Sequence, residues 1–296
     1  MSLADAAKKR RRAIALVTVA TLCFALLDAC AKWLVQPGAA QPLPVVEVVW
    51  LRFVIHVVLM GALLAPQHGL NLLRTRQPGL QLLRGLMLVS MTALNFVALQ
   101  YLQLAETGAI QFSVPLLIAL LSAWWLNERL DARRWLAIVA GFLGVLLVVR
   151  PGSHAFHPAI LLSVLNALVY AAFNLLTRRM AATESADTMQ LMSAAVPALL
   201  LAPLALPLWV WPATALQWAV LIVCGLMGGL GHLAVAHAHR HASAAVLGPF
   251  LYQQILYMAL WGWLVFGQVP DAAVVAGSLV VVASGLYLLW LEVRRR

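Results

Sequence analysis

Three polar side chains recur at helical spacing within one apolar segment of the chain, near residues 158–178. Asn166, Tyr170 and Asn174 follow one another at intervals of four residues, so a helix would place all three on one face. Polar groups inside a lipid-embedded segment are costly unless they face protein or water. The face therefore indicates either a solute-binding cavity or a set of interhelical hydrogen bonds, and the two interpretations carry equal weight.

Phe24 and Asp28 occupy the equivalent positions of the first apolar segment, near residues 13–35. With the amides and phenol of the later segment, they offer a carboxylate beside an aromatic ring. This mixture suits an amphipathic zwitterion, because Asp28 and the amides can bind an ammonium group while rings surround the side chain. Phe24 and Asp28 therefore join the candidate binding site.

Two other segments combine amide side chains with a proline. Gln111 precedes Pro115, and Pro249 precedes a second group of candidates. The candidates after Pro249 are polar or aromatic: Tyr252, Gln253, Gln254 and Tyr257. Proline lacks a backbone N–H and clashes with the preceding turn, so it permits a bend in a helix. Such bends suit a gated binding site, and a kink used only for packing is equally common.

Small and soft residues complete the candidate set. Met91 and Asn95 lie four residues apart on another helical face. Methionine there usually packs in a core, although its softness also suits a broad apolar pocket. Gly225 and Gly229 make the segment near residues 214–236 unusually thin. Close helix packing is the default role of such glycines, and a hinge is the functional alternative.

Four charged residues lie in the first two apolar segments. If these segments are antiparallel neighbours, the helical rise of about 1.5 Å per residue puts Asp28 at the depth of Arg52. The same geometry puts Lys32 at the depth of Glu47. We expect two interhelical ion pairs. The functional alternative is a proton-sensitive gate, in which Asp28 or Glu47 titrates as a pair forms and breaks.

Composition identifies lipid as the solvent of most of this chain. Hydrophobic residues make up 64% of the 296 positions and charged residues only 10%, and the mean hydropathy is +0.92. A soluble domain would carry far more charge on its surface. Each membrane span needs about 20 apolar residues. Breaks at proline, glycine and charge give ten predicted spans: 13–35, 44–65, 80–101, 105–126, 133–150, 158–178, 187–210, 214–236, 243–266 and 271–291.

The basic residues fix the direction of these spans. Alternating sides places seventeen Lys and Arg residues on one side and only Lys32 and Arg150 on the other. The positive-inside rule then predicts cytoplasmic N- and C-termini and an even number of spans. The net charge of +10 is thereby explained by membrane flanks, and no nucleic-acid partner is expected.

The chain is also internally duplicated. An offset of 140 residues places Gly85-Leu86-Met87 on Gly225-Leu226-Met227, and it likewise superposes Asp131-Ala132 on Asp271-Ala272. Single matches are weak in sequence rich in leucine and alanine. A nearly constant offset across several spans indicates a repeat.

The first span aligns with the sixth at an offset of 146 residues, which pairs Asp28 with Asn174 and Lys32 with Arg178. We therefore divide the chain into a first repeat, 1–150, and a second repeat, 151–296. Each repeat holds five spans, an odd number, so the second must be inverted relative to the first. Inverted repeats are typical of secondary transporters, whose substrate site lies where the repeats meet.

Particular residues add a family resemblance to this layout. Arg52 lies in the second span, and the fourth contains Pro115 and ends in Leu126-Asn127-Glu128-Arg129-Leu130. The whole chain thereby resembles the drug/metabolite transporter superfamily, in its EamA-type branch of ten-helix exporters. The second half has Phe266-Gly267-Gln268-Val269 at the matching place, with Gln where that branch usually has Glu. Within the branch, the chain is most similar to bacterial exporters of aromatic and other amino acids.

The resemblance implies an all-α integral membrane protein, with ten transmembrane helices as two inverted five-helix repeats around a central cavity. Helices 1, 3, 4, 6, 8 and 9 would line the cavity, and helices 5 and 10 would lie at the periphery. We expect a multi-pass protein of the bacterial inner membrane, monomeric or homodimeric, with the bilayer and a small-molecule substrate as its partners.

The expected function is secondary transport rather than enzymatic catalysis: export of aromatic and other neutral amino acids by alternating access. The alternative within transport is efflux of toxic organic cations. The alternative from another class is an intramembrane enzyme or a lipid-handling protein, which would need matched catalytic groups inside the spans. No cofactor or metal site is expected, because the three cysteines, Cys23, Cys30 and Cys224, are scattered through apolar segments.

Overall fold

The computed structural model describes residues 3–38, 41–125, 131–242 and 244–294. Within these ranges the secondary structure is entirely helical, with no strand. The helices are α1 (Leu3–Val35), α2 (Val45–His68), η1 (Gly69–Leu73), α3 (Pro78–Leu99), α4 (Leu104–Gln111), α5 (Val114–Trp125), α6 (Ala132–Val149), α7 (Ile160–Met180), α8 (Ala186–Ala205), η2 (Leu206–Leu208), α9 (Ala215–His239), α10 (Ala244–Leu251), α11 (Gln254–Phe266) and α12 (Ala272–Arg294).

Side-chain caps fix where several helices begin. Asp131 accepts a hydrogen bond from the Arg134 N–H at the start of α6, and Asp271 accepts one from the Val274 N–H at the start of α12. This bond and the Arg150 side chain lower the pKa of Asp271 below its ordinary value. The two aspartates are the ones that superpose at an offset of 140 residues, and each caps the N-terminus of the helix that follows it.

Two of the predicted spans are broken near their prolines. The fourth divides into α4 and α5, and Pro115 is the second residue of α5, where the missing N–H costs no helical hydrogen bond. The ninth divides into α10 and α11, and Pro249 lies two residues before the end of α10. Each break places irregular backbone inside the bundle.

Nine helical stretches of the described chain are long and apolar enough to cross a membrane, judged by length and composition. They correspond to nine of the ten predicted spans. The remaining one, 243–266, comprises α10 with 8 residues and α11 with 13 residues, each too short to cross alone. The motif Leu126–Leu130 lies outside the described residues.

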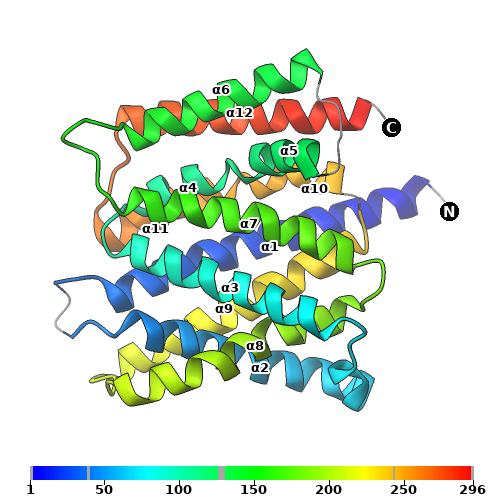
Figure 1. The fold of residues 1–296 in the computed structure, drawn as a ribbon, viewed down its shortest axis with the longest axis vertical. Coiled ribbons are helices and arrows are strands. Elements are labelled where there is room, and N and C mark those ends of the chain that lie inside the picture. The colour runs from blue at the N-terminus through cyan, green and yellow to red at the C-terminus, as the bar shows by residue number, and fades with distance from the viewer. Residues whose placement is uncertain (1–2, 39–40, 126–130, 243, 295–296) are drawn as a thin grey trace.

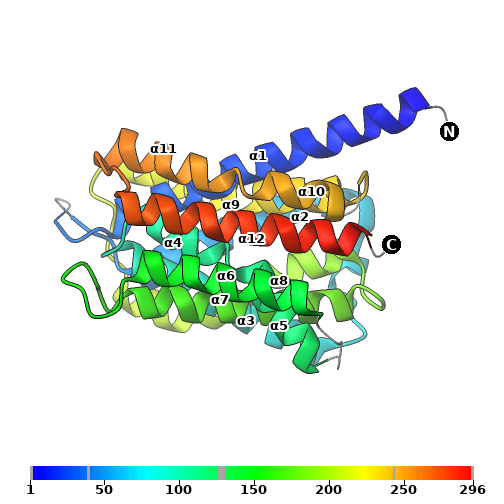
Figure 2. The ribbon, with the colours of Figure 1, turned by 90° about the horizontal axis from the view of Figure 1, so that it is seen from above.

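The helices run roughly parallel to one another, and both chain ends lie at the same end of the bundle (Figure 1). We call this the terminal end; it also holds the α2–α3 and α7–α8 connections. The opposite end, with the α1–α2 and α8–α9 connections, is called the distal end. The first turns of α1 project beyond the other helices at the terminal end (Figure 2).

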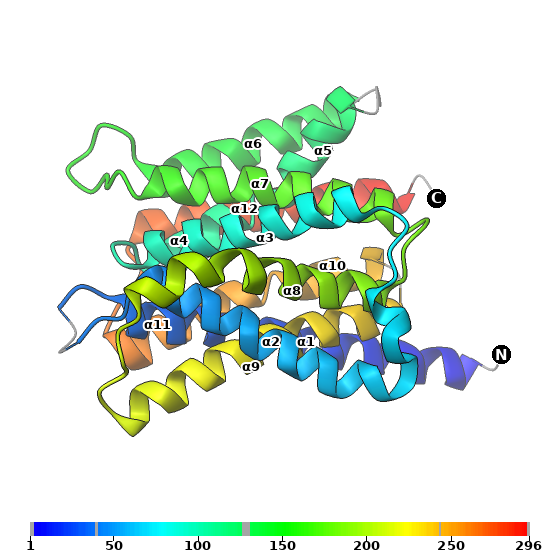
Figure 3. The same cartoon turned by 60° about the horizontal axis from the view of Figure 1, so that its bottom comes forward.

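Packing pairs helices from the two halves of the chain. The most extensive contacts join α1 with α9, α6 with α12, α3 with α7 and α2 with α8. Figure 1 shows α6 and α12 side by side along one edge of the bundle, and Figure 3 shows α8 running along α2 on the opposite side. Every one of these pairs therefore joins a helix of 1–150 to a helix of 151–296.

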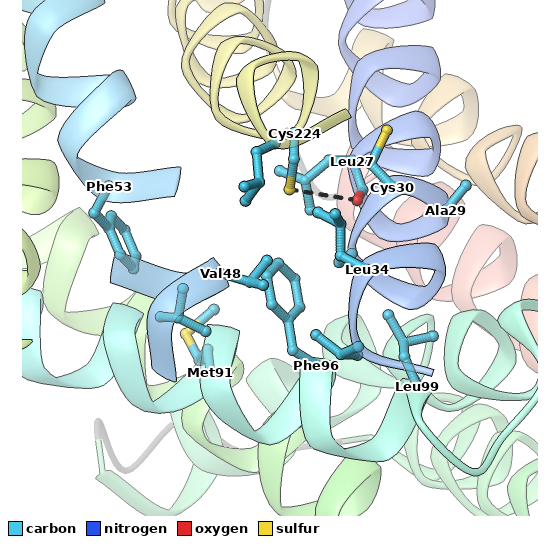
Figure 4. Packing of buried hydrophobic residues seen from close by; sticks show 14 of the residues in the cluster. Leu27, Ala29, Cys30, Leu34, Val48, Phe53, Met91, Phe96, Leu99 and Cys224 are labelled. Carbon is cyan, nitrogen blue, oxygen red and sulfur yellow. Dashed lines mark hydrogen bonds between the residues drawn. The ribbon is translucent and has the colours of Figure 1, made fainter. Parts of the chain in front are cut away.

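The largest apolar cluster fills the middle and distal part of the bundle. It joins residues of α1, α2, α3 and α9, among them Phe53 and the three residues Leu34, Phe96 and Leu99, which lie near one another in Figure 4. The outward faces of the helices are apolar as well: Leu136 on α6 is 68% exposed and Leu279 on α12 is 66% exposed. Large apolar side chains on the outside of a helical bundle indicate that lipid surrounds it.

Glycines on α9 allow α2 and α1 to approach closely. A Cβ built at Gly225 would lie 2.6 Å from the Ile55 Cβ, and one built at Gly229 would lie 2.7 Å from Leu59. At Gly231 it would lie 2.6 Å from the Phe24 ring. Both predicted hinge glycines thus have a packing role at these contacts.

Gly225→Ala should therefore destabilise the protein. Its new methyl group meets the branched Cβ of Ile55, which cannot move without its helix, and overpacking of this kind costs about 1–3 kcal/mol. Gly61→Ala in α2 is the matched control, since no atom lies within 4 Å of its built Cβ. Thermal unfolding in detergent should give a lower midpoint for the first variant and an unchanged or higher one for the second; equal midpoints would contradict the packing role.

Candidate functional site: a polar cavity in the bundle

A cavity of about 340 Å³ lies inside the bundle, within the range of about 300–1,000 Å³ typical of small-molecule sites. Nine of the predicted binding residues line it: Phe24, Asp28, Met91, Asn95, Gln111, Asn166, Tyr170, Asn174 and Gln254. The lining continues to Thr177, Ala186 and Ala236, which lie at the terminal ends of α7, α8 and α9. The cavity therefore extends from mid-bundle to the terminal end.

A chain of hydrogen bonds crosses the inner part of this cavity. The Gln111 side-chain amide donates to Asn95 Oδ1 at 3.0 Å, and Asn95 Nδ2 donates to Asp28 Oδ1 at 2.8 Å. The chain links α4, α3 and α1 and orients the carboxylate of Asp28, which is only 5% exposed. One oxygen of Asp28 is thus bound by an amide, while the residue as a whole faces the cavity.

Arg52 reaches the same cavity from α2. Its Nη1 donates to Thr92 Oγ1 at 3.3 Å, and its guanidinium lies 4.5 Å from the centre of the Phe53 ring. The close approach of Gly228 leaves room for it, since a Cβ there would lie 3.2 Å from Arg52 Nε. That Nε is buried, and no hydrogen-bond partner for it occurs in the described chain.

The predicted ion pair between Asp28 and Arg52 does not form. Among the described residues the ion pairs within 4.0 Å involve other groups, and Asp28 binds Asn95 instead. The prediction placed both groups at the right depth but ignored α3, which supplies the polar partners of both, Asn95 and Thr92. A buried carboxylate and a buried guanidinium therefore line one cavity without forming a direct ion pair.

The second predicted pair is also wrong, for a similar reason. Lys32 Nζ donates to the backbone carbonyls of Leu99 at 2.7 Å and Leu102 at 2.8 Å. Glu47 Oε2 accepts from the Val210 N–H at 2.9 Å. Helix depth alone cannot tell that backbone groups at the ends of other helices lie nearer than the opposite charge.

The polar face of α7, formed by Asn166, Tyr170 and Asn174, could line a solute-binding cavity or form interhelical hydrogen bonds. Asn174 Nδ2 donates to the Tyr170 carbonyl within its own helix at 2.7 Å. Asn166 is buried, and its Oδ1 has no partner within the described chain. Neither amide bonds to another helix there, so α7 presents these groups to the cavity. The interhelical hydrogen bonds run instead through Asp28, Asn95 and Gln111.

Sequence reasoning missed Arg84, which lines the terminal part of the cavity from α3. Its Nε donates to Thr177 Oγ1 at 2.9 Å, its Nη1 donates to the Met189 carbonyl at 2.7 Å, and it also bonds to Ser193. The guanidinium lies 4.8 Å from the centre of the Phe173 ring. Arg84 is one of the seventeen basic residues that the positive-inside count assigns to one side of the membrane, although its place six residues after the start of α3 at Pro78 puts it inside the span.

Sequence reasoning also missed His232, a cavity residue on α9. Its ring meets Phe24 edge-on at 5.1 Å and stacks on His56 of α2 at 5.6 Å. A single histidine within the glycine-rich run of α9 was the available signal.

The lining of this cavity contains one carboxylate, that of Asp28, and two guanidiniums, those of Arg52 and Arg84.

Three predicted binding residues do not line the cavity. Gln253 Nε2 donates to Thr18 Oγ1 at 3.0 Å, and Tyr257 packs against the large apolar cluster. Tyr252 is buried against α12, where its hydroxyl occupies the space beside Gly285, and its Oη has no hydrogen-bond partner in the described chain. The break at residues 252–253 turns these side chains away from the cavity face on which Gln254 lies.

A multi-helix membrane bundle whose mostly apolar cavity holds a few charged and amide side chains is suited to moving a solute. The chain belongs to the EamA-like transporter family, whose model matches residues 11–150 and again residues 157–291. The superfamily recognised from the sequence is thereby confirmed.

Named relatives extend over most of the chain. The riboflavin transporter of Vibrio cholerae is 31% identical over 280 residues, 93% of this chain and 92% of the relative. The pseudopaline exporter of Pseudomonas aeruginosa is 30% identical over 277 residues, covering 93% and 95%. The S-adenosylmethionine uptake transporter of Rickettsia felis is 29% identical over 226 residues, 76% of each chain.

A solved crystal structure matches 100% of both chains with a TM-score of 0.61 and 20% sequence identity. At that identity the likeness concerns the fold alone. The relatives above are named for three different solutes and not specifically for amino acids. Family membership therefore establishes a multi-pass membrane transporter and leaves the substrate to be argued from the cavity.

Tyr252→Phe tests the assignment of Tyr252 to packing. An unpaired buried hydroxyl costs about 1–3 kcal/mol, so its removal should leave the thermal midpoint unchanged or raise it. Tyr170→Phe, which alters a cavity-lining phenol, is the comparison. We expect solute binding, measured by the ligand-induced rise in thermal midpoint, to change only for Tyr170→Phe. Loss of several degrees of stability in Tyr252→Phe would reveal a hydroxyl partner and contradict the assignment.

Proposed function

We propose that this protein is a secondary transporter that exports amino acids, preferably aromatic and other neutral ones, across the bacterial inner membrane by alternating access. The observation that carries the proposal is the separated pair Asp28 and Arg52. Both groups are almost fully buried, at 5% and 4% exposure, both line the cavity, and they do not pair with each other. Separated opposite charges in a cavity suit the head group of a zwitterion.

In this arrangement the ammonium group of the substrate binds at Asp28, whose orientation is fixed by Asn95 and Gln111. The carboxylate binds at Arg52, whose guanidinium keeps donors free after its bond to Thr92. Each substrate charge then satisfies a protein charge that is otherwise costly to bury. The aromatic rings of the lining surround the apolar side chain: Phe24, Phe96, Tyr170 and Phe173.

The organic-cation alternative fits this lining less well. A dication has two positive charges to satisfy, whereas the cavity offers one carboxylate, Asp28, and two guanidiniums, Arg52 and Arg84. Like charges facing one another across a low-dielectric site are repulsive. A substrate that carries a carboxylate reverses the sign of that interaction, so the charge balance favours the zwitterion.

Alternating access requires the two predicted inverted five-helix repeats, and three observations support them. The family model matches the two halves separately. Equivalent aspartates cap α6 and α12. Two extensive contacts between the halves also correspond under exchange of the halves: the contact of α1 with α9 corresponds to that of α7 with α3, and the contact of α2 with α9 corresponds to that of α8 with α3.

The terminal end is proposed as the cytoplasmic end. It carries the basic residues of the N-terminal run, Arg74 and Arg76 of the α2–α3 connection, Arg178 and Arg179 in the last turn of α7, and Arg294 at the end of α12, as the positive-inside rule requires. With this orientation, the cavity of the present structure is accessible from the cytoplasm, the compartment in which an exporter binds its substrate. The structure then corresponds to the loading state.

The decisive measurement is uptake into proteoliposomes of labelled phenylalanine, threonine and methyl viologen, with and without a pH gradient. Phenylalanine should be transported, and excess unlabelled phenylalanine should compete, whereas its amide (no carboxylate) and phenylpropionate (no ammonium) should compete at least about tenfold less well, or about 1.4 kcal/mol per missing charge. Transport of the dication without any amino acid would overturn the proposal.

Asp28→Asn and Arg52→Gln should each lower phenylalanine transport about tenfold or more, because a bound charge loses its partner. We expect both variants to fold, since each keeps a polar side chain: Asn is isosteric with Asp, and Gln retains the first part of the Arg stem and an amide donor. The control is the exposed pair Arg150 and Asp271 outside the cavity: Arg150→Gln and Asp271→Asn make the same charge changes and should transport at the wild-type rate. Wild-type uptake by Asp28→Asn would exclude both the binding role and a titrating gate at Asp28.

A further inference from the structure

Lys32 fastens the distal end of α1 to the end of α3. The side chain is 3% exposed, and its ammonium group donates to the carbonyls of Leu99 at 2.7 Å and Leu102 at 2.8 Å. The same ammonium group lies over the Phe266 ring of α11, with Nζ 5.6 Å from the centre of the ring. The last carbonyls of a helix are unpaired and carry the negative end of its dipole, so they form a natural receptor for a cation. The contact joins α1 to the end of α3 at the distal end of the bundle, where Lys32 also lines a second hollow that is separate from the cavity of the candidate site.

The same receptor exists at the terminal end, on α9. The backbone N–H groups of Tyr101 and Leu102 both donate to the Ala98 carbonyl, at 3.0 and 2.9 Å. At an offset of 140 residues, those of His241 and Ala242 both donate to the Ala238 carbonyl, at 2.9 and 3.1 Å. The ends of α3 and α9 therefore have one backbone conformation, and the carbonyls of His239 and Ala242 correspond to those that bind Lys32.

A cation equivalent to Lys32 also exists. The offset of 146 residues that aligns α1 with α7 pairs Lys32 with Arg178, which lies in the last turn of α7 at the terminal end. Arg178 is exposed, and no ion pair or side-chain hydrogen bond of it occurs among the described residues. Cation and receptor are thus both present at this end, but they are not engaged.

The contacts between helices explain why Lys32 binds its carbonyls whereas Arg178 does not bind the equivalent ones. α1 packs against α3, whereas their counterparts α7 and α9 make no comparable contact in the described chain. The cavity reaches the terminal end between these two helices: Asn174 and Thr177 of α7 face it from one side, and Val235 and Ala236 of α9 from the other. The interface of α1 with α3 at the distal end, which we call the distal seam, is therefore packed. The equivalent interface of α7 with α9 at the terminal end, which we call the terminal seam, is open to the cavity.

We infer that Lys32 and Arg178 are alternating latches, each of which closes one end of the cavity by binding the C-terminal carbonyls of the opposing helix. In the present state Lys32 holds α1 to α3 and the terminal seam is open. In the other state α7 closes on α9, Arg178 donates to the carbonyls of His239 and Ala242, and Lys32 leaves Leu99 and Leu102. This inference rests on the proposed alternating access and adds the residues that set its equilibrium.

The test measures the accessibility of the terminal seam and needs no substrate. Ala236→Cys serves as the reporter, in a background in which Cys23, Cys30 and Cys224 are replaced by alanine, and its rate of modification by a maleimide is followed. Lys32→Met keeps the apolar stem but removes the ammonium group, so it weakens the present state. Labelling should become about tenfold slower, as expected when a charge-assisted set of hydrogen bonds is lost.

Adding Arg178→Ala to Lys32→Met should restore the fast labelling, because it removes the opposing latch. Arg179→Ala is the matched control: the same charge is lost one residue away from the aligned position, and labelling should stay slow. Gln36→Ala, one turn beyond Lys32, should label like the reporter alone. Unchanged labelling in Lys32→Met, or equal restoration by Arg179→Ala, would overturn the inference.

If Lys32→Met does not give monodisperse protein, Lys32→Gln replaces it. The amide can still donate to one carbonyl, so labelling should slow by a smaller factor and be restored by the same second change; no slowing would count against the latch. The outcome is separate from that of the transport assay. Latch behaviour without amino-acid transport would reject the proposed substrate alone, and amino-acid transport without latch behaviour would reject the latches alone.

Discussion

The constraint on which this structure depends is that a polar group inside a lipid-embedded bundle must find a partner within the protein. The backbone meets it by forming helices throughout the described residues. The few charged side chains meet it in different ways. Asp28 uses Asn95 and Gln111, Lys32 uses the carbonyls that α3 leaves unpaired, and Arg84 uses groups of α7 and α8. Each solution joins helices that are distant in the sequence, so the polar groups also hold the bundle together.

Arg52 meets the constraint only in part, and that makes it informative. Its Nη1 bonds to Thr92 while its Nε stays unpaired. A buried guanidinium with a spare donor, which lines the same cavity as a buried carboxylate, is costly in the empty site and less costly when a zwitterion binds both. The same kinds of polar contact therefore stabilise the bundle and are proposed to bind the substrate. In the cavity, the charges of Asp28 and Arg52 are proposed to find their full set of partners only when the substrate is bound.

The same helix-end chemistry accounts for the proposed conformational change. A helix cannot satisfy its own last carbonyls, so each of α3 and α9 exposes a receptor for a cation. Duplication supplies two receptors and two cations in opposite orientations. Because the halves cannot both close on one cavity, the state that engages Lys32 releases Arg178. Small residues such as Gly225 and Gly229 let α9 stay close to α2, so helices of the two halves are packed together beside the cavity.

The sequence by itself determined the membrane environment, the positions of the spans and most of the lining, because these follow from local patterns of apolar, polar and basic residues. The i, i+4 spacing of Asn166, Tyr170 and Asn174 was enough to place them on the cavity face. Only the tertiary structure decided partners. Depth along a helix pointed to Asp28–Arg52 and Lys32–Glu47, but the neighbours that bind these groups come from α3 and the α8–α9 connection. The tertiary structure also turned Tyr252 and Gln253 away from the cavity at the break between α10 and α11, where the direction of a side chain depends on what packs around it. Tyr257 packs against the apolar cluster instead, and the packing of α3 and α9 brings Arg84 and His232 to the cavity.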